Sequence, residues 1–174
     1  MALKPIHTFP DPVLREKAKP VTKFNDDLKK LVRDMAETLY AAPGVGLAAN
    51  QVGVLQQVIV IDVRDQEENI NTGLVALINP RIVFAEGEAS IDEGCLSVPE
   101  ERAEVPRFAH VKVEAQDPDG HLMEIDGKGY LAIVLQHEID HLNGVLFIDH
   151  LSPLKRAAIK KRLKKQKLQS ANNG

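Results

Sequence analysis

The first regular pattern of hydrophobic positions along the chain is that of an amphipathic helix. Five apolar side chains recur at helical spacing: Leu28, Leu31, Val32, Met35 and Leu39. This spacing predicts a helix with one buried face. Polar residues 25–27 can cap its start, and Pro43-Gly44 ends it.

Runs of β-branched and alternating residues predict strands in the middle of the chain. Three candidate strands share such an apolar run: 58–61, 74–78 and 81–85. A break at Asn79-Pro80 separates the last two.

Residues 111–114 alternate apolar and polar, as a half-buried strand does. The turn signal Asp117-Pro118-Asp119-Gly120 joins them to residues 121–125 as a hairpin.

Two further helices are expected in the second half of the chain. Residues 130–135 are apolar on every side, which predicts a buried helix ending at Asn143-Gly144. Ser152-Pro153 starts a last helix over 153–168, followed by a flexible tail at 169–174. The predicted fold is therefore α+β: mixed or antiparallel strands around a central helix, with N-terminal and C-terminal helices beside them.

Composition and charge narrow the class of protein. With 174 residues, 44% of them hydrophobic, we expect a single domain spanning residues 1–174. The formal net charge of −3 argues against a DNA-binding protein, and the single cysteine excludes an internal disulfide. No apolar run approaches the ~20 residues of a membrane helix, and we see no secretory signal. We expect a cytoplasmic protein without a membrane partner, or an organellar one whose transit peptide has been removed.

The segment His137-Glu138-Ile139-Asp140-His141 carries the strongest chemical signal. On a helix it places two imidazoles one turn apart on the same face, where they can bind one metal ion. Glu138 can then reach a water at the open position of that metal without being a ligand itself. Two histidines at this spacing also occur by chance on solvated helices. Here the preceding apolar run predicts burial, and burying these groups without partners would cost several kcal/mol.

A catalytic site of this kind needs a third protein ligand, and Cys95 is the candidate. The competing interpretation is a buried structural cysteine. A blue-copper site would use a similar donor set but adds a weak axial ligand, often methionine, and no methionine lies near either segment. A cysteine protease would use Cys95 as a nucleophile and would leave the paired histidines and Glu138 unexplained.

The glycine-rich segment Gly44-Val45-Gly46-Leu47-Ala48-Ala49 superficially fits a dinucleotide-binding motif. That motif must follow a strand and open a helix, whereas this segment follows a helix and precedes a strand. We therefore interpret it as a loop that delivers Gln51, whose amide can donate to a developing oxyanion or can be an ordinary loop hydrogen bonder.

Three segments together resemble the motifs of peptide deformylases: Gly44-Val45-Gly46-Leu47-Ala48-Ala49-Asn50-Gln51, Glu93-Gly94-Cys95-Leu96-Ser97 and Gln136-His137-Glu138-Ile139-Asp140-His141. They occur in the order of the family, and the likeness extends to about residue 154. The last helix is similar to that of the bacterial type with a long C-terminal helix. The resemblance implies a hydrolase that removes the N-formyl group from the N-terminal formyl-methionine of newly made polypeptides and releases formate.

The resemblance also implies roles for individual residues. Cys95, His137 and His141 match the ligands of one divalent ion, usually ferrous iron (Fe²⁺), with nickel, cobalt or zinc as substitutes. Gln51 and the backbone amide of Leu96 match the donors to the formyl oxygen, and Glu138 matches the general base and acid. The positions that match the substrate-binding residues are Val45, Gly46, Ile91, Arg102, Tyr130, Ile133 and Val134.

Eight Lys or Arg residues and no acidic residue lie between residues 153 and 167, and this local basic patch is ordinarily a solvated helix face. The resemblance suggests docking on ribosomal RNA. Two other functions remain open. A zinc endopeptidase would share the metal-binding helix, but its third ligand usually lies downstream, where His150 lacks the expected spacing. A non-catalytic metal-binding module would close the coordination with a fourth protein ligand.

Overall fold

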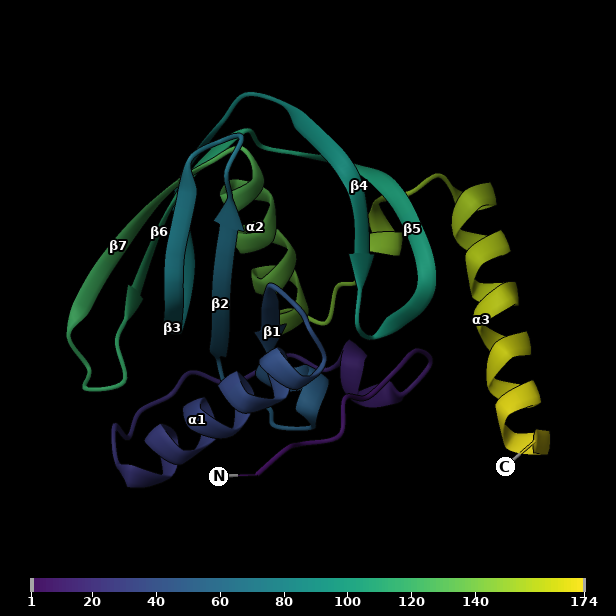
Figure 1. The fold of residues 1–174 in the computed structure, drawn as a ribbon, viewed down its shortest axis with the longest axis horizontal. Coiled ribbons are helices and arrows are strands. Elements are labelled where there is room, and N and C mark those ends of the chain that lie inside the picture. Colours follow the sequence, from purple (N-terminus) through teal and green to yellow (C-terminus); the bar gives the residue numbers. More distant parts are fainter. Residues whose placement is uncertain (1, 174) are drawn as a thin grey trace.

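The computed structural model describes residues 2–173 and has the predicted α+β fold, with strands around a central helix (Figure 1). Its α-helices are α1 (Asp26–Ala41), α2 (Tyr130–Leu142) and α3 (Pro153–Asn173). Its short 3-10 helices are η1 (Pro12–Arg15), η2 (Ala49–Val52) and η3 (Phe147–His150).

The strands form two antiparallel sheets. The larger sheet has the order β1-β2-β3-β6-β7, in which the strands are β1 (Gly46–Ala48), β2 (Val58–Asp65), β3 (Ile70–Glu86), β6 (His110–Gln116) and β7 (Leu122–Lys128). The smaller sheet pairs β4 (Ala89–Cys95) with β5 (Val98–Arg107). The central helix α2 lies between the two sheets, and α3 lies on the far side of β5 (Figure 1).

The larger sheet is packed on both faces, which explains why β2 is a continuous apolar run. Successive residues of a strand point to opposite faces. Ile59 therefore faces α2 and packs with Leu131 and Leu135, whereas Val58 and Val60 face α1. α1 begins as predicted, because the Asn25 side chain accepts a hydrogen bond from the backbone N–H of Leu28.

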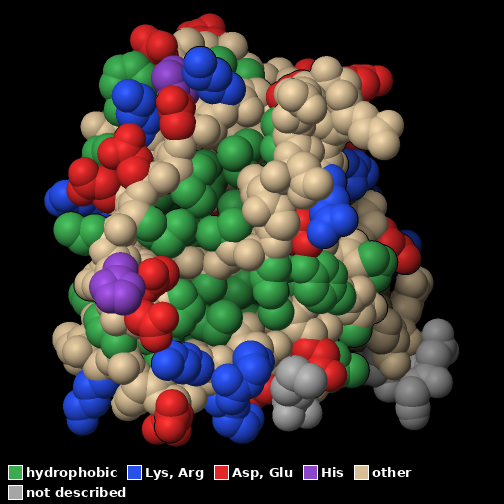
Figure 2. Space-filling view, turned by 60° about the vertical axis from the view of Figure 1, so that its left-hand side comes forward, with side chains coloured by type: hydrophobic (Ala, Val, Ile, Leu, Met, Phe, Trp, Pro, Cys, Tyr) green, Lys and Arg blue, Asp and Glu red, His purple; other side chains and the backbone are tan. Residues whose placement is uncertain are grey.

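α1 covers only part of its face of the sheet. Leu74 lies on that face and is 47% exposed, and Ile82, Val83 and Phe84 of β3 are also exposed. Figure 2 shows hydrophobic side chains gathered in the middle of one face of the molecule, with charged side chains around them. Among residues 2–173, no helix is long and apolar enough to cross a membrane.

The start of α2 is capped by a residue from a distant turn. Gly129 precedes the helix at φ +60° and has no side chain with which to cap it. Instead, the Glu68 carboxylate, in the turn between β2 and β3, accepts a hydrogen bond of 3.0 Å from the backbone N–H of Tyr130. The positive φ favours glycine at position 129, and a β-carbon there would displace the Glu68 carboxylate from its capping position. The far end of α2 stops at Gly144, at φ +75°.

Two predictions about the strands need correction. Asn79-Pro80 does not end a strand, because β3 runs through it with a shift in register. Asn79 adopts φ +52°, and its side chain hydrogen-bonds the backbone of Val21, so a kink replaces the expected break. The second correction is an omission: the β4–β5 hairpin was not predicted, although the hairpin formed by β6 and β7 was and is confirmed.

The last helix is longer than the sequence predicts. α3 extends to Asn173, so residues 169–173 are helical instead of forming the tail expected from 169, and residue 174 lies outside the described residues. No proline or glycine interrupts the segment before residue 174, and its residue types tolerate a helix. Ile159 and Leu163 bury one side of α3 in a cluster with Phe147.

Candidate metal centre

Three side chains converge where the end of β4 meets α2. His137 and His141 lie one turn apart on α2, and their ring centroids are 5.0 Å apart. Cys95 is the last residue of β4, and its Sγ lies 3.3 Å from Nε2 of His141. One donor atom from each of the three residues lies within 4.8 Å of the others. One sulfur and two nitrogen donors at this separation can surround a single ion.

The surroundings of the two histidines fit a bound cation. Burial lowers the pKa of His141 well below its ordinary value, so its ring is neutral and offers a lone pair. Its Nδ1 is buried and has no hydrogen-bond partner among the described residues. Burial opposes a charge on His137 as well, but hydrogen bonds with Cys95 and Glu93 outweigh burial and raise its pKa well above the ordinary value. The environment of His137 therefore favours positive charge.

Glu93 holds the ring of His137 in place. Its Oε1 lies 3.0 Å from Nδ1 of His137, which leaves Nε2 for an ion. Its carboxylate is also bonded by Nε and Nη2 of Arg107, both at 2.9 Å. Burial favours the neutral acid, yet the hydrogen bonds from His137 and Arg107 prevail and lower the pKa of Glu93. Phe147 stacks on the ring of His137, with centroids 6.2 Å apart.

Glu138 lies beside this donor set as a buried carboxyl group. It is 4% exposed, and its Oε1 has no hydrogen-bond partner in the described part of the chain. Burial raises the pKa of Glu138 to about 7, although the charge of His137 acts against this. Gly46 makes room for the carboxyl group, because a β-carbon there would lie 2.6 Å from its Oε2. An acid with this pKa can both accept and return a proton near neutral pH.

The amide of Gln51 is held in one orientation. Its Oε1 accepts a hydrogen bond from the backbone N–H of Ala48 at 3.0 Å. Its Nε2 therefore points toward the end of β4: it donates to Oγ of Ser97, in the β4–β5 turn, at 3.0 Å and lies 3.7 Å from the sulfur of Cys95. The Cys95 sulfur also accepts from the backbone N–H of Ser97 at 3.4 Å. These donors suit a thiolate, and the Gln51 amide is preorganised next to it.

A cavity of about 450 Å³ opens onto these groups. All the residues that the sequence assigns to catalysis or substrate binding line it: Val45, Gly46, Gln51, Ile91, Leu96, Arg102, Tyr130, Ile133, Val134 and Glu138. Cys95 and His137 line it as well, and His141 lies deeper at 1% exposed. The structure therefore brings together residues that are up to 96 positions apart, from Val45 to His141.

Two of these lining residues have distinctive surroundings. Arg102 crosses the strand next to it: its Nε donates to the Asp92 carboxylate at 2.8 Å and its Nη2 to the Asp92 carbonyl at 2.7 Å. Its Nη1 lies 2.6 Å from where a β-carbon of Gly94 would be, so glycine provides the space for this crossing. Burial raises the pKa of Tyr130, which keeps its hydroxyl neutral in the wall of the cavity.

Sequence reasoning missed several residues that support the site. Glu93 was quoted only as part of a motif, although its position two residues before Cys95 places both side chains on the same face of a strand. Ser97 and Phe147 gave no signal of their contacts. Arg107 was also missed, because an arginine at the end of a charged segment is ordinarily predicted to be exposed. In the structure, the side chain of Arg107 is 4% exposed.

The fold and the site define a metal-dependent hydrolase, in which a Cys-His-His donor set and a buried carboxyl group face an open cavity. The family model for polypeptide deformylase matches residues 3–157. The chain belongs to the peptide deformylase family. Enzymes of this family hydrolyse the N-formyl amide at the formyl-methionine of nascent polypeptides. An endopeptidase and a non-catalytic metal-binding module are thereby set aside.

Individual relatives agree with this assignment. A peptide deformylase of Syntrophobacter fumaroxidans is 52% identical over 166 residues, which cover 95% of this chain and 96% of the relative. The crystal structure of a peptide deformylase from Legionella pneumophila is 46% identical with a TM-score of 0.88, covering 97% of this chain and 98% of that one. A structure of the Ehrlichia chaffeensis enzyme in complex with actinonin is 39% identical with a TM-score of 0.91, covering 95% and 98%.

Proposed function

We propose that Cys95, His137 and His141 hold one divalent ion and that Glu138 moves the protons when the formyl group is hydrolysed. The observation that carries this proposal is the convergence of three donor atoms within 4.8 Å, beside a carboxyl group that is buried in the wall of a cavity. An ion held there would supply a Lewis acid for the formyl carbonyl and for the attacking water. Cys95, His137 and Glu138 line the cavity, so substrate and water could reach an ion held there.

Glu138 accepts a proton from the water as its oxygen bonds to the formyl carbon. The same carboxyl group then delivers that proton to the peptide nitrogen as the carbon–nitrogen bond breaks. The products are a free amino terminus and formic acid, which becomes formate by giving its proton to the new amine or to water. The raised pKa of Glu138 suits both steps, because neither protonation state is strongly disfavoured near neutral pH.

The negative charge on the formyl oxygen is stabilised by two donors, Nε2 of Gln51 and the backbone N–H of Leu96. Gln51 needs no rearrangement for this role, because Ala48 already fixes its carbonyl end. A donor that is oriented before the reaction contributes more than one that must reorganise. Both residues line the cavity next to Cys95.

The methionine side chain of the substrate occupies the apolar part of the cavity, lined by Val45, Ile91, Tyr130, Ile133 and Val134. Gly46 and Arg102 also line the cavity and, in this proposal, bind the peptide backbone. A cavity with apolar walls and few polar groups is typical of a small-ligand site. Val45 and Ile91 are partly exposed at 39% and 36%, as residues that cover a substrate only when it is bound should be.

Ferrous iron (Fe²⁺) is the native ion in this proposal, and Ni²⁺, Co²⁺ or Zn²⁺ can replace it. One thiolate and two imidazoles accept all four ions, so the ion present in the cell depends on availability as well as affinity. We further propose that residues 1–174 act as one catalytic domain in the cytoplasm, or in an organelle if a transit peptide has been removed.

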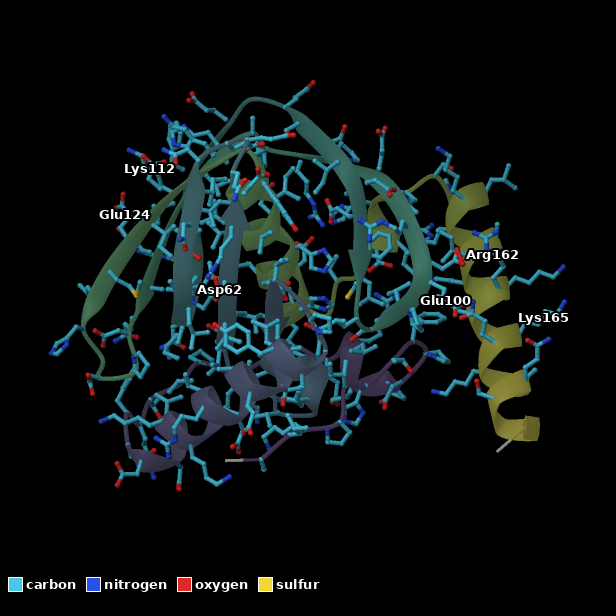
Figure 3. All side chains as sticks on the ribbon, viewed as in Figure 1. Asp62, Glu100, Lys112, Glu124, Arg162 and Lys165 are labelled. Carbon is cyan, nitrogen blue, oxygen red and sulfur yellow. The ribbon has the colours of Figure 1, made fainter. Side chains whose placement is uncertain are left out.

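The basic side of α3 docks on the ribosome in this proposal. Ile159 and Leu163 bury the inner side of the helix, and Lys161, Lys164 and Lys165 are exposed. Lys165 points away from β5 (Figure 3). Charge reversal at Lys161 and Lys165 should weaken co-sedimentation with ribosomes at low salt, while the same reversal at exposed Lys17 and Lys23 should not. The docking proposal would be contradicted if the Lys161/Lys165 variant and the Lys17/Lys23 variant co-sedimented with ribosomes equally well.

The catalytic assignment is tested by formate release from a short formyl-methionyl peptide, with protein purified anaerobically in ferrous iron. We expect Glu138→Gln to keep one metal per chain and to lose most of the rate, because the amide cannot accept the proton. A native protein that binds the metal tightly but releases no formate would overturn the proposed roles. So would a Glu138→Gln variant with undiminished activity.

A further inference from the structure

A row of charged groups connects the metal centre with the molecular surface. It starts at Nδ1 of His137, which lies 3.0 Å from the Glu93 carboxylate. Arg107 grips that carboxylate with two hydrogen bonds of 2.9 Å and reaches Oδ2 of Asp140 with Nη1 at 2.7 Å. Oδ2 of Asp140 lies 2.8 Å from Nε2 of His150, which is 36% exposed in its side chain.

Arg107 links the two elements that supply the metal ligands. Glu93 lies on β4, two residues before Cys95, and Asp140 lies on α2, directly before His141. The planar guanidinium group, which is 4% exposed, fixes both carboxylates at once. The separation of β4 and α2 sets the distance between the sulfur and the two imidazoles. Arg107 therefore controls the geometry of the donor set without touching it.

The outer carboxylate is the weakest link in this row. The Glu93 side chain is only 3% exposed, whereas that of Asp140 is 26% exposed and can turn toward water. A carboxylate has no hydrogen to donate, so Nε2 of His150 donates to Asp140. This bond holds Asp140 against Arg107. His150 lies at the end of η3, and it has no part in the chemistry described above.

We propose that Asp140 and His150 are positioning residues for the metal centre, because they hold Arg107, which in turn fixes Glu93 and the ring of His137. The inference rests on the proposed ligand set. It explains why an aspartate stands at position 140, between Ile139 and His141 in the metal-binding motif. It also assigns a role to His150, which is not in the group of donor residues formed by Cys95, His137 and His141.

The test measures metal retention and not only turnover. The protein is loaded with Co²⁺, and its transfer to a chelator is followed through the absorption of the cobalt–thiolate chromophore. We expect Asp140→Asn to speed metal loss by about 10- to 100-fold, as outer partners of metal ligands do. We expect His150→Phe to speed it by about three- to tenfold, the worth of one hydrogen bond. The cobalt spectrum should shift in both variants, because the ligand angles relax.

His150→Gln is the conservative variant, since its amide can donate to Asp140, and it should restore most of the native retention. His121→Phe is the matched control: His121 is also paired with an aspartate, Asp117 at 3.4 Å, but it lies in the exposed β6–β7 turn. Unchanged retention and spectrum in folded His150→Phe and Asp140→Asn would overturn the inference. A native protein that shows no cobalt–thiolate absorption would instead refute the ligand set itself, so the two failures are distinguishable.

Discussion

Two helices of this molecule use polar residues in opposite ways. In α2, the residues Gln136, His137, Glu138 and His141 are each at most 9% exposed. The two histidines have partners on β4, and Gln136 bonds the backbone of Phe108 between β5 and β6. In α3, most of the basic residues face solvent, and Arg162 is the one with a bidentate partner, Glu101 on β5, among the described side chains. Figure 3 shows Arg162 on α3 alongside the strand that carries Glu100.

The difference shows that the tolerance of a helix to substitution depends more on where its charged residues lie than on how many there are. A buried polar group must be satisfied, so its neighbours are fixed and a small change is costly. An exposed charge is screened by water and salt, so it tolerates change. α2 is therefore expected to be sensitive to single substitutions, and the outer side of α3 is expected to tolerate them. Substitutions of decreasing effect can test this comparison.

The largest effect is expected for His141→Ala. Removal of a ligand should weaken metal binding by more than about 100-fold, the upper end of the range for outer partners of ligands. Metal per chain after gel filtration should fall close to zero, and formate release should fall with it. If the variant retained one metal per chain with native affinity, His141 would not be a ligand. The native protein treated with a chelator and then reloaded is the reference for this measurement.

The next effect is expected for Gln51→Ala, which removes one of the two proposed donors to the formyl oxygen. The rate constant kcat should fall by about 10²–10³-fold, while the metal content stays at one per chain. KM should change little, because the donor acts on charge that develops during the reaction. A loss confined to KM would instead indicate that Gln51 binds the substrate in its ground state.

A smaller but informative effect is expected for Gly46→Ala. The new β-carbon would lie 2.6 Å from Oε2 of Glu138, so the carboxyl group must shift. A displacement of this size can cost on the order of 10²-fold in activity. Ala48→Gly, two residues along the same strand, serves as a control for the flexibility of β1. Native activity of Gly46→Ala would mean that Glu138 can work from a different position.

The smallest effect is expected on α3. Lys161→Glu combined with Lys165→Glu should leave kcat/KM for a short formyl-methionyl peptide within about twofold of the native value, because exposed charges contribute roughly 0–1 kcal/mol. By contrast, Leu163→Ala on the buried side of the same helix should reduce the free energy of unfolding by about 2–5 kcal/mol. A large loss of activity in the double lysine variant would show that the outer side of α3 is as sensitive to substitution as α2.

The residues that gather at the cavity can be predicted from local spacing, whereas the β4–β5 hairpin beside them cannot. The spacing of His137 and His141 carries its own geometry, because a helix converts four positions into one turn. Cys95 is the candidate for the third ligand because it is the one cysteine of the sequence, and the structure places it beside the two histidines. The β4–β5 hairpin could not be predicted, because three of its charged residues, Glu93, Glu101 and Arg107, are buried and disturb the usual alternation.

The partners of those charged residues are also invisible in the sequence. Arg107 contacts Asp140, which is 33 positions away in the sequence, and Glu93, which is 14 positions away. No local sequence pattern predicts either contact. Asn79 gave a misleading signal for a similar reason. Asn79-Pro80 ordinarily ends a strand, but here the Asn79 side chain bonds to Val21, 58 residues earlier, so tertiary contacts replace the lost ladder bonds.

The cap that Glu68 places on α2 has a consequence for grafting foreign sequence into this chain. The molecule offers two hairpin turns that look equally suitable as insertion points, at residues 66–69 and at residues 117–120. The first turn also serves as the anchor of the catalytic helix, so an epitope or fluorescent tag placed there would free the backbone of Tyr130 and loosen a wall of the cavity. The second turn is held to α1 by the ion pair of Lys29 with Asp119, whose side chains are both exposed. It is therefore the turn at which the chain can be lengthened with the active centre left intact.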